Sequence, residues 1–91
     1  MNIFKHNKID KVWTNICAHE GETFYTIRNI PYTYTVYDEY ILINNDKRRR
    51  ITKHHLQIAL SVDDPSPAKL NRENVWGPSY VYGIITDNKI L

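Results

Sequence analysis

The chain has 91 residues, of which 42% are hydrophobic and 24% charged, and a formal net charge of +2. This length allows one domain, residues 1–91, with a modest core, and the composition excludes a disordered chain. The small net charge means that any electrostatic binding surface must be local. Cys17 is the single cysteine. It excludes an intramolecular disulfide and favours a reducing, cytoplasmic location.

No segment has the length and apolar character of a membrane span, and the first residues lack the apolar stretch of a signal peptide. We therefore expect no contact with a membrane. The abundance of Asn, Ile, Lys and Tyr favours an AT-rich coding source, such as a low-GC bacterium or its phage.

The first third of the chain is predicted to contain an arm and two strands. Residues 1–10 are polar with scattered apolar side chains, which is typical of a flexible or loosely docked arm. Residues 12–17 alternate in polarity and predict a strand, and residues 23–28 predict a second strand after the turn at Gly21.

The middle of the chain predicts an antiparallel meander. Residues 32–37 alternate between Tyr and Thr, and the acidic pair at 38–39 forms a turn into a further strand at 40–43. Thr52 is a good N-cap for a helix at about 52–62, and Ile51 and Leu56 have the spacing of a hydrophobic staple.

Residues 63–75 are expected to form a connecting loop, since Pro65 and Pro67 end the helix. Residues 79–86 remain open between two interpretations. Their β-branched and aromatic side chains favour a strand, whereas Ser79 as a cap and an apolar spacing of four permit a short helix.

Together these elements predict an α+β fold: a small antiparallel meander sheet of three to four strands packed against one helix, followed by a C-terminal strand or short helix. The order of three strands and then a helix over residues 23–62 is similar to that of small sheet-type DNA-binding domains, among them a plant class and the arm-binding domains of integrases. The similarity lies in element order alone and implies contact with DNA only by analogy.

The densest cationic group lies where the sheet is expected to pass into the helix: Lys47, Arg48, Arg49, Arg50, Lys53 and His54. Clustered cations beside a helix N-terminus are typical of phosphate binding. We expect these side chains to contact DNA or RNA as one exposed surface. Outward-facing Thr33, Thr35 and Tyr37 would add sugar or base contacts. The alternative is a solvated corner, partly neutralised by nearby carboxylates.

Other functions use other residues. Trp76 can anchor a loop that binds a host or self protein, as in a phage or mobile-element inhibitor, and an exposed Tyr/Thr strand edge permits a dimer. A small RNase would use His19 with His54 or His55, supported by Glu20 or Glu22 and by Arg50. A zinc site would need Cys17 and His19 to meet the His54–His55 pair. We expect no metal, no cofactor and no catalytic residue.

Overall fold

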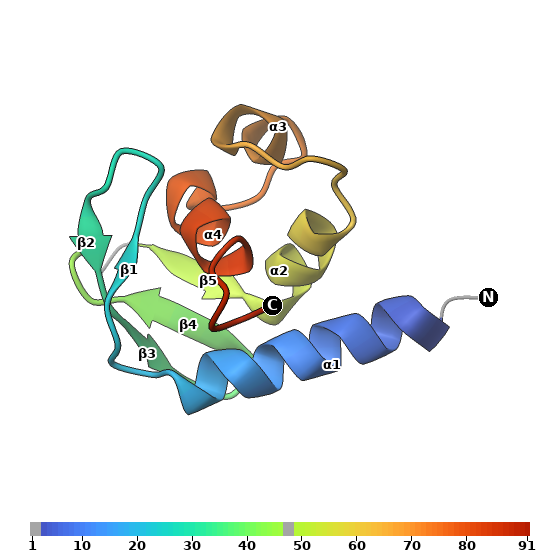
Figure 1. Ribbon diagram of the computed structural model, residues 1–91, viewed down its shortest axis with the longest axis horizontal. Helices are drawn as coiled ribbons and strands as arrows, with labels where there is room; N and C mark the ends of the chain where they lie inside the picture. Colours follow the sequence, from blue (N-terminus) through green and yellow to red (C-terminus); the bar gives the residue numbers. More distant parts are fainter. Residues whose placement is uncertain (1–2, 47–48) are drawn as a thin grey trace.

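The computed structural model describes residues 3–46 and 49–91, and within these ranges the chain forms a small α+β fold (Figure 1). The elements in chain order are α1 (Ile3–Ala18), β1 (Phe24–Tyr25), β2 (Pro31–Tyr32), β3 (Tyr34–Val36), β4 (Tyr40–Ile43), β5 (Arg50–Thr52), α2 (Lys53–Leu60), α3 (Pro67–Arg72) and α4 (Pro78–Ile85). None of the helices in the described ranges is long and apolar enough to cross a membrane.

Helix α1 stands where the sequence predicts an arm and a strand. Ile9, Val12 and Ile16 are all buried, and their spacing of three and four places them on one helical face. The strand prediction for residues 12–17 is therefore wrong. A separation of four residues, as between Val12 and Ile16, fits one face of a strand and also one face of a helix. Ile9, which the prediction assigned to the arm, is the third residue of the helical face.

The predicted antiparallel meander is confirmed in a three-stranded sheet of order β3-β4-β5. The predicted strand at 32–37 is divided, because Tyr32 pairs with Phe24 in a separate two-stranded sheet formed by β1 and β2. On the three-stranded sheet, Ile41 and Ile51 pair across the strands and are fully buried on the inner face.

Residues from the α1–β1 connection cover the β3 edge of this sheet. The Gly21 N–H donates to Tyr34 O at 3.3 Å, and the Val36 N–H donates to Glu20 Oε2 at 2.7 Å. These bonds satisfy backbone groups that an uncovered edge would offer to a second chain. Dimerisation through a strand edge stays a prediction, and β3 is not a free edge for it.

Helix α2 begins after Thr52 as predicted, and the Thr52 Oγ1 accepts from the His55 N–H at 3.1 Å. The connector expected as a loop at 63–75 instead contains α3, capped by Ser66. Of the two interpretations left open for residues 79–86, the short helix is confirmed, since these residues lie in α4 and its C-cap. Pro78 at the start of α4 has the backbone angle that a first helical turn needs.

The helices gather on the inner side of the three-stranded sheet, with α4 between the β1–β2 hairpin and α2 (Figure 1). Helix α4 presents Val81, Ile84 and Ile85 to the core. Tyr32 ties it to the hairpin, since its hydroxyl donates to Tyr80 O at 2.6 Å. Burial of Tyr32 raises the pKa of this hydroxyl well above its usual range, so that it stays a donor.

Candidate nucleic-acid interface

Two of the six predicted contact residues, Lys47 and Arg48, lie outside the described residues. Arg49 follows them and is exposed, with 55% of its side chain accessible. Its Nε lies 3.5 Å from Asp46 Oδ2, and its backbone N–H donates to Asp46 O. Arg49 is therefore partly neutralised by the turn that carries it.

Arg50 points to the outer face of the three-stranded sheet. It pairs with Leu42 across β4, which places it diagonally opposite Tyr40, and its guanidinium carbon lies 4.5 Å from the centroid of the Tyr40 ring. The Tyr40 ring is stacked on Tyr37, with centroids 5.0 Å apart and an interplanar angle of 14°. One exposed guanidinium and two rings thus form a group that we call the Tyr37–Tyr40–Arg50 stack.

Lys53 and His54 point elsewhere. The Lys53 Nζ lies 3.8 Å from Asp10 Oδ1 on α1 and 5.9 Å from the centroid of the Trp13 ring. His54 is exposed, and its ring centroid is 6.0 Å from that of His55. The four described residues of the predicted six therefore have four different sets of neighbours, and their action as one common anion-facing surface stays a prediction.

The strand residues expected beside the cations do face outward. Thr33 and Thr35 are half-buried, and Asn44 joins them: its Oδ1 accepts from Thr35 Oγ1 at 2.8 Å, and its Nδ2 donates to Thr33 Oγ1 at 2.9 Å. Tyr37 keeps 46% of its surface exposed. The pairing of Tyr40 with Arg50 was not predicted from the sequence, because that contact depends on the register of two strands.

A cleft of 590 Å³ opens beside the stack, between α1 and the β3–β4 turn. Its lining residues are Trp13, Cys17, Val36, Tyr37, Asp38 and Tyr40. Burial and, to a smaller extent, the charge of Glu20 raise the pKa of the Cys17 thiol. The thiol is therefore protonated at neutral pH and is a poor nucleophile.

The residues of the RNase interpretation are engaged in structural contacts. His19 Nδ1 lies 2.7 Å from Glu22 Oε2, and Glu20 binds the Val36 N–H. His55 Nδ1 accepts the Trp76 backbone N–H at 3.1 Å. In residues 3–46 and 49–91, no group of three His, Cys, Asp or Glu side chains could hold a metal ion.

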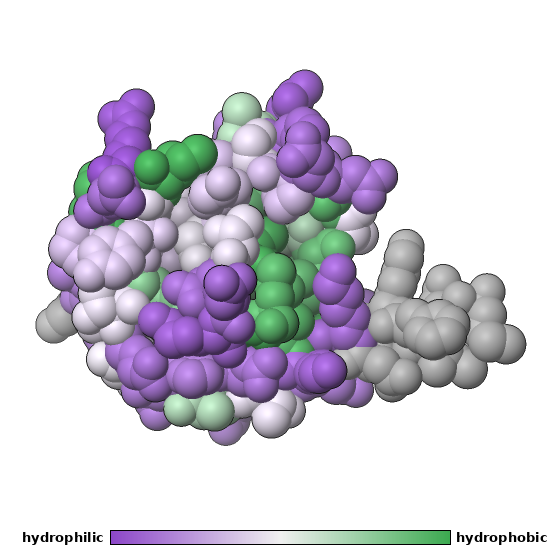
Figure 2. Space-filling view, viewed as in Figure 1, coloured by the Kyte–Doolittle hydropathy of each residue, from purple (hydrophilic) through white to green (hydrophobic). Residues whose placement is uncertain are grey.

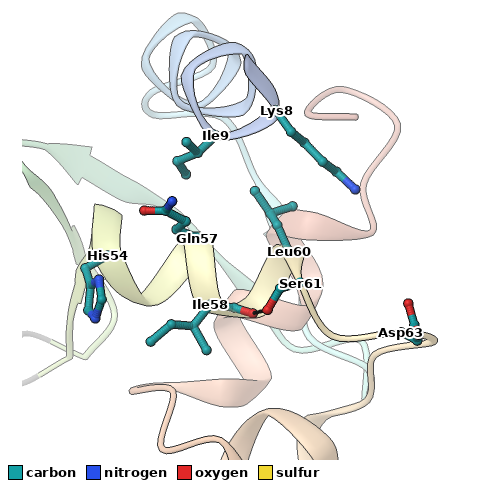
Figure 3. Close-up of a pocket in the computed structure, with 8 residues that line it drawn as sticks. All are labelled: Lys8, Ile9, His54, Gln57, Ile58, Leu60, Ser61 and Asp63. Atoms are coloured by element: carbon teal, nitrogen blue, oxygen red, sulfur yellow. Dashed lines mark hydrogen bonds between the residues drawn. The ribbon is translucent and has the colours of Figure 1, made fainter. Parts of the chain in front are cut away.

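A second cleft, of 550 Å³, involves α1 and α2 (Figure 3). Ile9 from α1 and Gln57 and Leu60 from α2 point into the space between the two helices, whereas His54 and Ile58 extend from the other side of α2. Lys8 and Asp63 also line the cleft, and Figure 3 shows both of them well apart from the His54 ring. The arrangement therefore offers no acid–base pair with His54.

Comparison of the chain with protein-family models, with curated proteins and with solved structures returned no match. The geometry of the described residues is therefore the basis on which a function can be proposed.

Proposed function

We propose that the chain is a small non-catalytic accessory or regulatory protein of the cytoplasm, of bacterial or phage origin, that contacts nucleic acid through the outer face of its three-stranded sheet. The observation that carries the proposal is the Tyr37–Tyr40–Arg50 stack, in which exposed Tyr37 and Arg50 flank the half-buried Tyr40 on the paired strands β4 and β5. Exposed rings with a guanidinium beside them suit the stacking of bases and the neutralisation of phosphate.

The stack has the two properties that such contact needs. Tyr37 has an exposed ring, and stacking against Tyr40 holds it in place, so that a base can bind with little loss of side-chain freedom. Arg50 has no carboxylate within ion-pair distance among the described residues, in contrast to Arg49 and Lys53. Among the described residues of the predicted six, Arg50 therefore has the guanidinium or ammonium group most available to phosphate.

The experiment is the salt dependence of nucleic-acid affinity, measured by fluorescence anisotropy with labelled duplex and single-stranded oligonucleotides. We expect Arg50→Ala to weaken binding and to reduce the slope of log affinity against log salt by about 0.9 for duplex, the value for one lost phosphate contact. Arg72→Ala is the matched control, since it removes an exposed arginine from α3, away from the stack. Absence of binding at low salt, or equal loss in both variants, would remove the proposal.

A second candidate function is protein binding through the β1–β2 hairpin. Ile27 and Ile30 in its turn are each 55% exposed, and Tyr25 is 54% exposed. Figure 2 shows hydrophobic surface at the tip of this hairpin, beside hydrophilic side chains, and grouped exposed apolar residues rimmed by polar ones are typical of interaction sites. The partner would be a host protein or a second copy of the chain.

This candidate is tested with the double variant Ile27→Ser/Ile30→Ser. We expect the variant to lose stoichiometric, nuclease-resistant capture of one protein, or to lose self-association in sedimentation, while it stays folded. Unchanged behaviour in both assays would contradict the candidate and leave the nucleic-acid proposal as it stands.

A further inference from the structure

A separate cleft of 370 Å³, which shares no lining residue with the Tyr37–Tyr40–Arg50 stack, lies between Arg49 and the α3–α4 connection. Its lining consists of Arg49, Asn71, Asn74, Val75, Trp76, Gly77 and Pro78. We call it the Trp76 cleft. It brings a flat aromatic ring, a guanidinium and two side-chain amides together on one surface.

Trp76 is exposed yet held in position. The residue is 56% exposed, although the neighbouring Val75 and Gly77 are buried. The backbone N–H of Trp76 donates to His55 Nδ1, and the His55 ring meets the indole edge to face at 4.8 Å. Gly77 has φ of 60°, in the left-handed region that favours glycine, and it turns the chain after Trp76 into the start of α4.

The polar groups of the cleft are available to a ligand. Within the part of the chain that the structure describes, the side-chain amides of Asn71 and Asn74 and the indole N–H of Trp76 make no hydrogen bond. An amide supplies one acceptor and two donors, the pattern that pairs with the edge of a nucleobase. Arg49 at the rim lies 3.5 Å from Asp46 Oδ2 through its Nε, but 55% of its side chain is accessible, so that its guanidinium can still meet the negative charge of an adjoining phosphate.

From this arrangement we infer that the Trp76 cleft binds one unpaired nucleobase, stacked on the indole, hydrogen-bonded by Asn71 or Asn74 and flanked by a phosphate on Arg49. The inference rests on the proposed function and makes it specific, because a base inside a duplex exposes no face for stacking. The preferred ligand is then single-stranded nucleic acid or an unpaired end. Amides and a guanidinium favour this ligand over an apolar protein segment.

The test uses Trp76 as its own reporter. The chain has two tryptophans, so the variant Trp13→Phe leaves Trp76 as the only one. We expect a single-stranded oligonucleotide to quench its fluorescence and a blunt-ended hairpin duplex of equal charge to leave it unchanged. Trp76→Leu should weaken single-strand affinity about tenfold, in the range of one lost base stack, whereas Trp76→Tyr should retain most of it. Circular dichroism confirms the fold of each variant.

The outcomes separate the two claims. Wild-type affinity in Trp76→Leu, or equal quenching by duplex, overturns the inference while Arg50-dependent binding upholds the proposed function. If Trp76→Leu abolishes nuclease-resistant capture of a protein and leaves oligonucleotide binding unchanged, the cleft is a protein contact and the inference is wrong. If neither wild type nor Trp13→Phe binds any oligonucleotide at low salt, both claims fall.

Discussion

Gly83 determines how closely α4 approaches the β1–β2 hairpin. A Cβ at this position would overlap the Tyr25 carbonyl oxygen and would lie 2.6 Å from the Tyr32 hydroxyl. Backbone cannot move aside as a flexible side chain can, so the whole helix would have to shift. The same hydroxyl donates to Tyr80 O, and a shift would also lengthen that bond. Gly83 is thus required by packing although it lies within a helix.

We therefore predict that Gly83→Ala lowers the free energy of unfolding by about 2 kcal/mol, within the usual cost of overpacking. This loss exceeds the ~1 kcal/mol that alanine gains over glycine in a helix. Ser79→Ala is the control, because Ser79 is exposed on the same helix and should change stability by less than about 0.5 kcal/mol. Equal urea midpoints for the two variants would contradict the packing argument.

His55 gives a second prediction at the residue scale. Burial and the neighbouring His54 lower the pKa of His55 below 6.5, and its Nδ1 must be unprotonated to accept the Trp76 N–H. The unfolded state then binds the proton more readily than the folded state. The stability that this residue contributes is fully present above pH 6.5 and is lost as the pH falls through the folded pKa.

The measurement is the urea midpoint between pH 7.5 and 5, with the His55 pKa read by NMR. We expect wild type to lose stability towards pH 5 more steeply than His55→Asn, whose amide oxygen can replace the acceptor but does not titrate. Parallel curves for the two proteins, or a folded pKa above 6.5, would refute the assignment.

At the scale of elements, the sequence predicted those whose signals are local. Strand β4 and helix α2 have the predicted positions, since the strand alternates between buried and half-buried residues and Thr52 caps the helix. The residues of α4 carry strand-type side chains because the helix is buried along most of its surface, where β-branched residues pack well. Tertiary burial there outweighs propensity. Helix α1 was missed because its apolar stripe includes Ile9, which lies in the largely polar segment 1–10 that was predicted to be an arm.

The candidate site was only partly predictable for a similar reason. The sequence identifies Arg50 and Tyr37 as exposed and functional candidates. Their assembly through Tyr40 depends on the β4–β5 register, in which Leu42 pairs with Arg50. That register places Ile41 opposite Ile51, and a shift by one residue would move these two buried side chains to the outer face. The Trp76 cleft combines segments more than 20 residues apart in sequence. A local sequence pattern cannot predict contacts between such distant segments.

The junction of β5 and α2 yields a prediction for an element. Thr52 is the last residue of the strand and the N-cap of the helix, and its Oγ1 satisfies the His55 N–H. Thr52→Ala should lower the free energy of unfolding by about 1 kcal/mol, whereas Thr52→Ser, which keeps the oxygen, should lose less. Chemical denaturation measures both. A serine variant as unstable as the alanine variant would show that the methyl group, and not the cap, matters here.

For the whole molecule, the distribution of charge matters more than its sum. A net charge of +2 gives no strong long-range attraction to a polyanion. Lys53 lies close to Asp10 and Arg49 close to Asp46. The β3–β4 turn also sets exposed Asp38 and Glu39 next to the Tyr37–Tyr40–Arg50 stack. Affinity for nucleic acid should therefore be moderate and limited by these carboxylates.

Loss of carboxylates near the stack should raise the affinity for nucleic acid, whereas loss of a cation should lower it. The double variant Asp38→Asn/Glu39→Gln removes two negative charges beside the stack and keeps the shape of the turn, in which Glu39 uses its backbone carbonyl to accept the Lys53 N–H. At low salt we expect affinity for single-stranded oligonucleotides to rise by about three- to tenfold, and the gain to shrink as salt screens the field over a Debye length of about 10 Å at 0.1 M. The control for a general change in net charge is Asp63→Asn/Asp64→Asn, which removes the same number of exposed carboxylates from the α2–α3 connection. If both variants raise affinity equally, binding follows total charge and not the outer sheet face, and a fall in affinity would place the carboxylates in the contact itself.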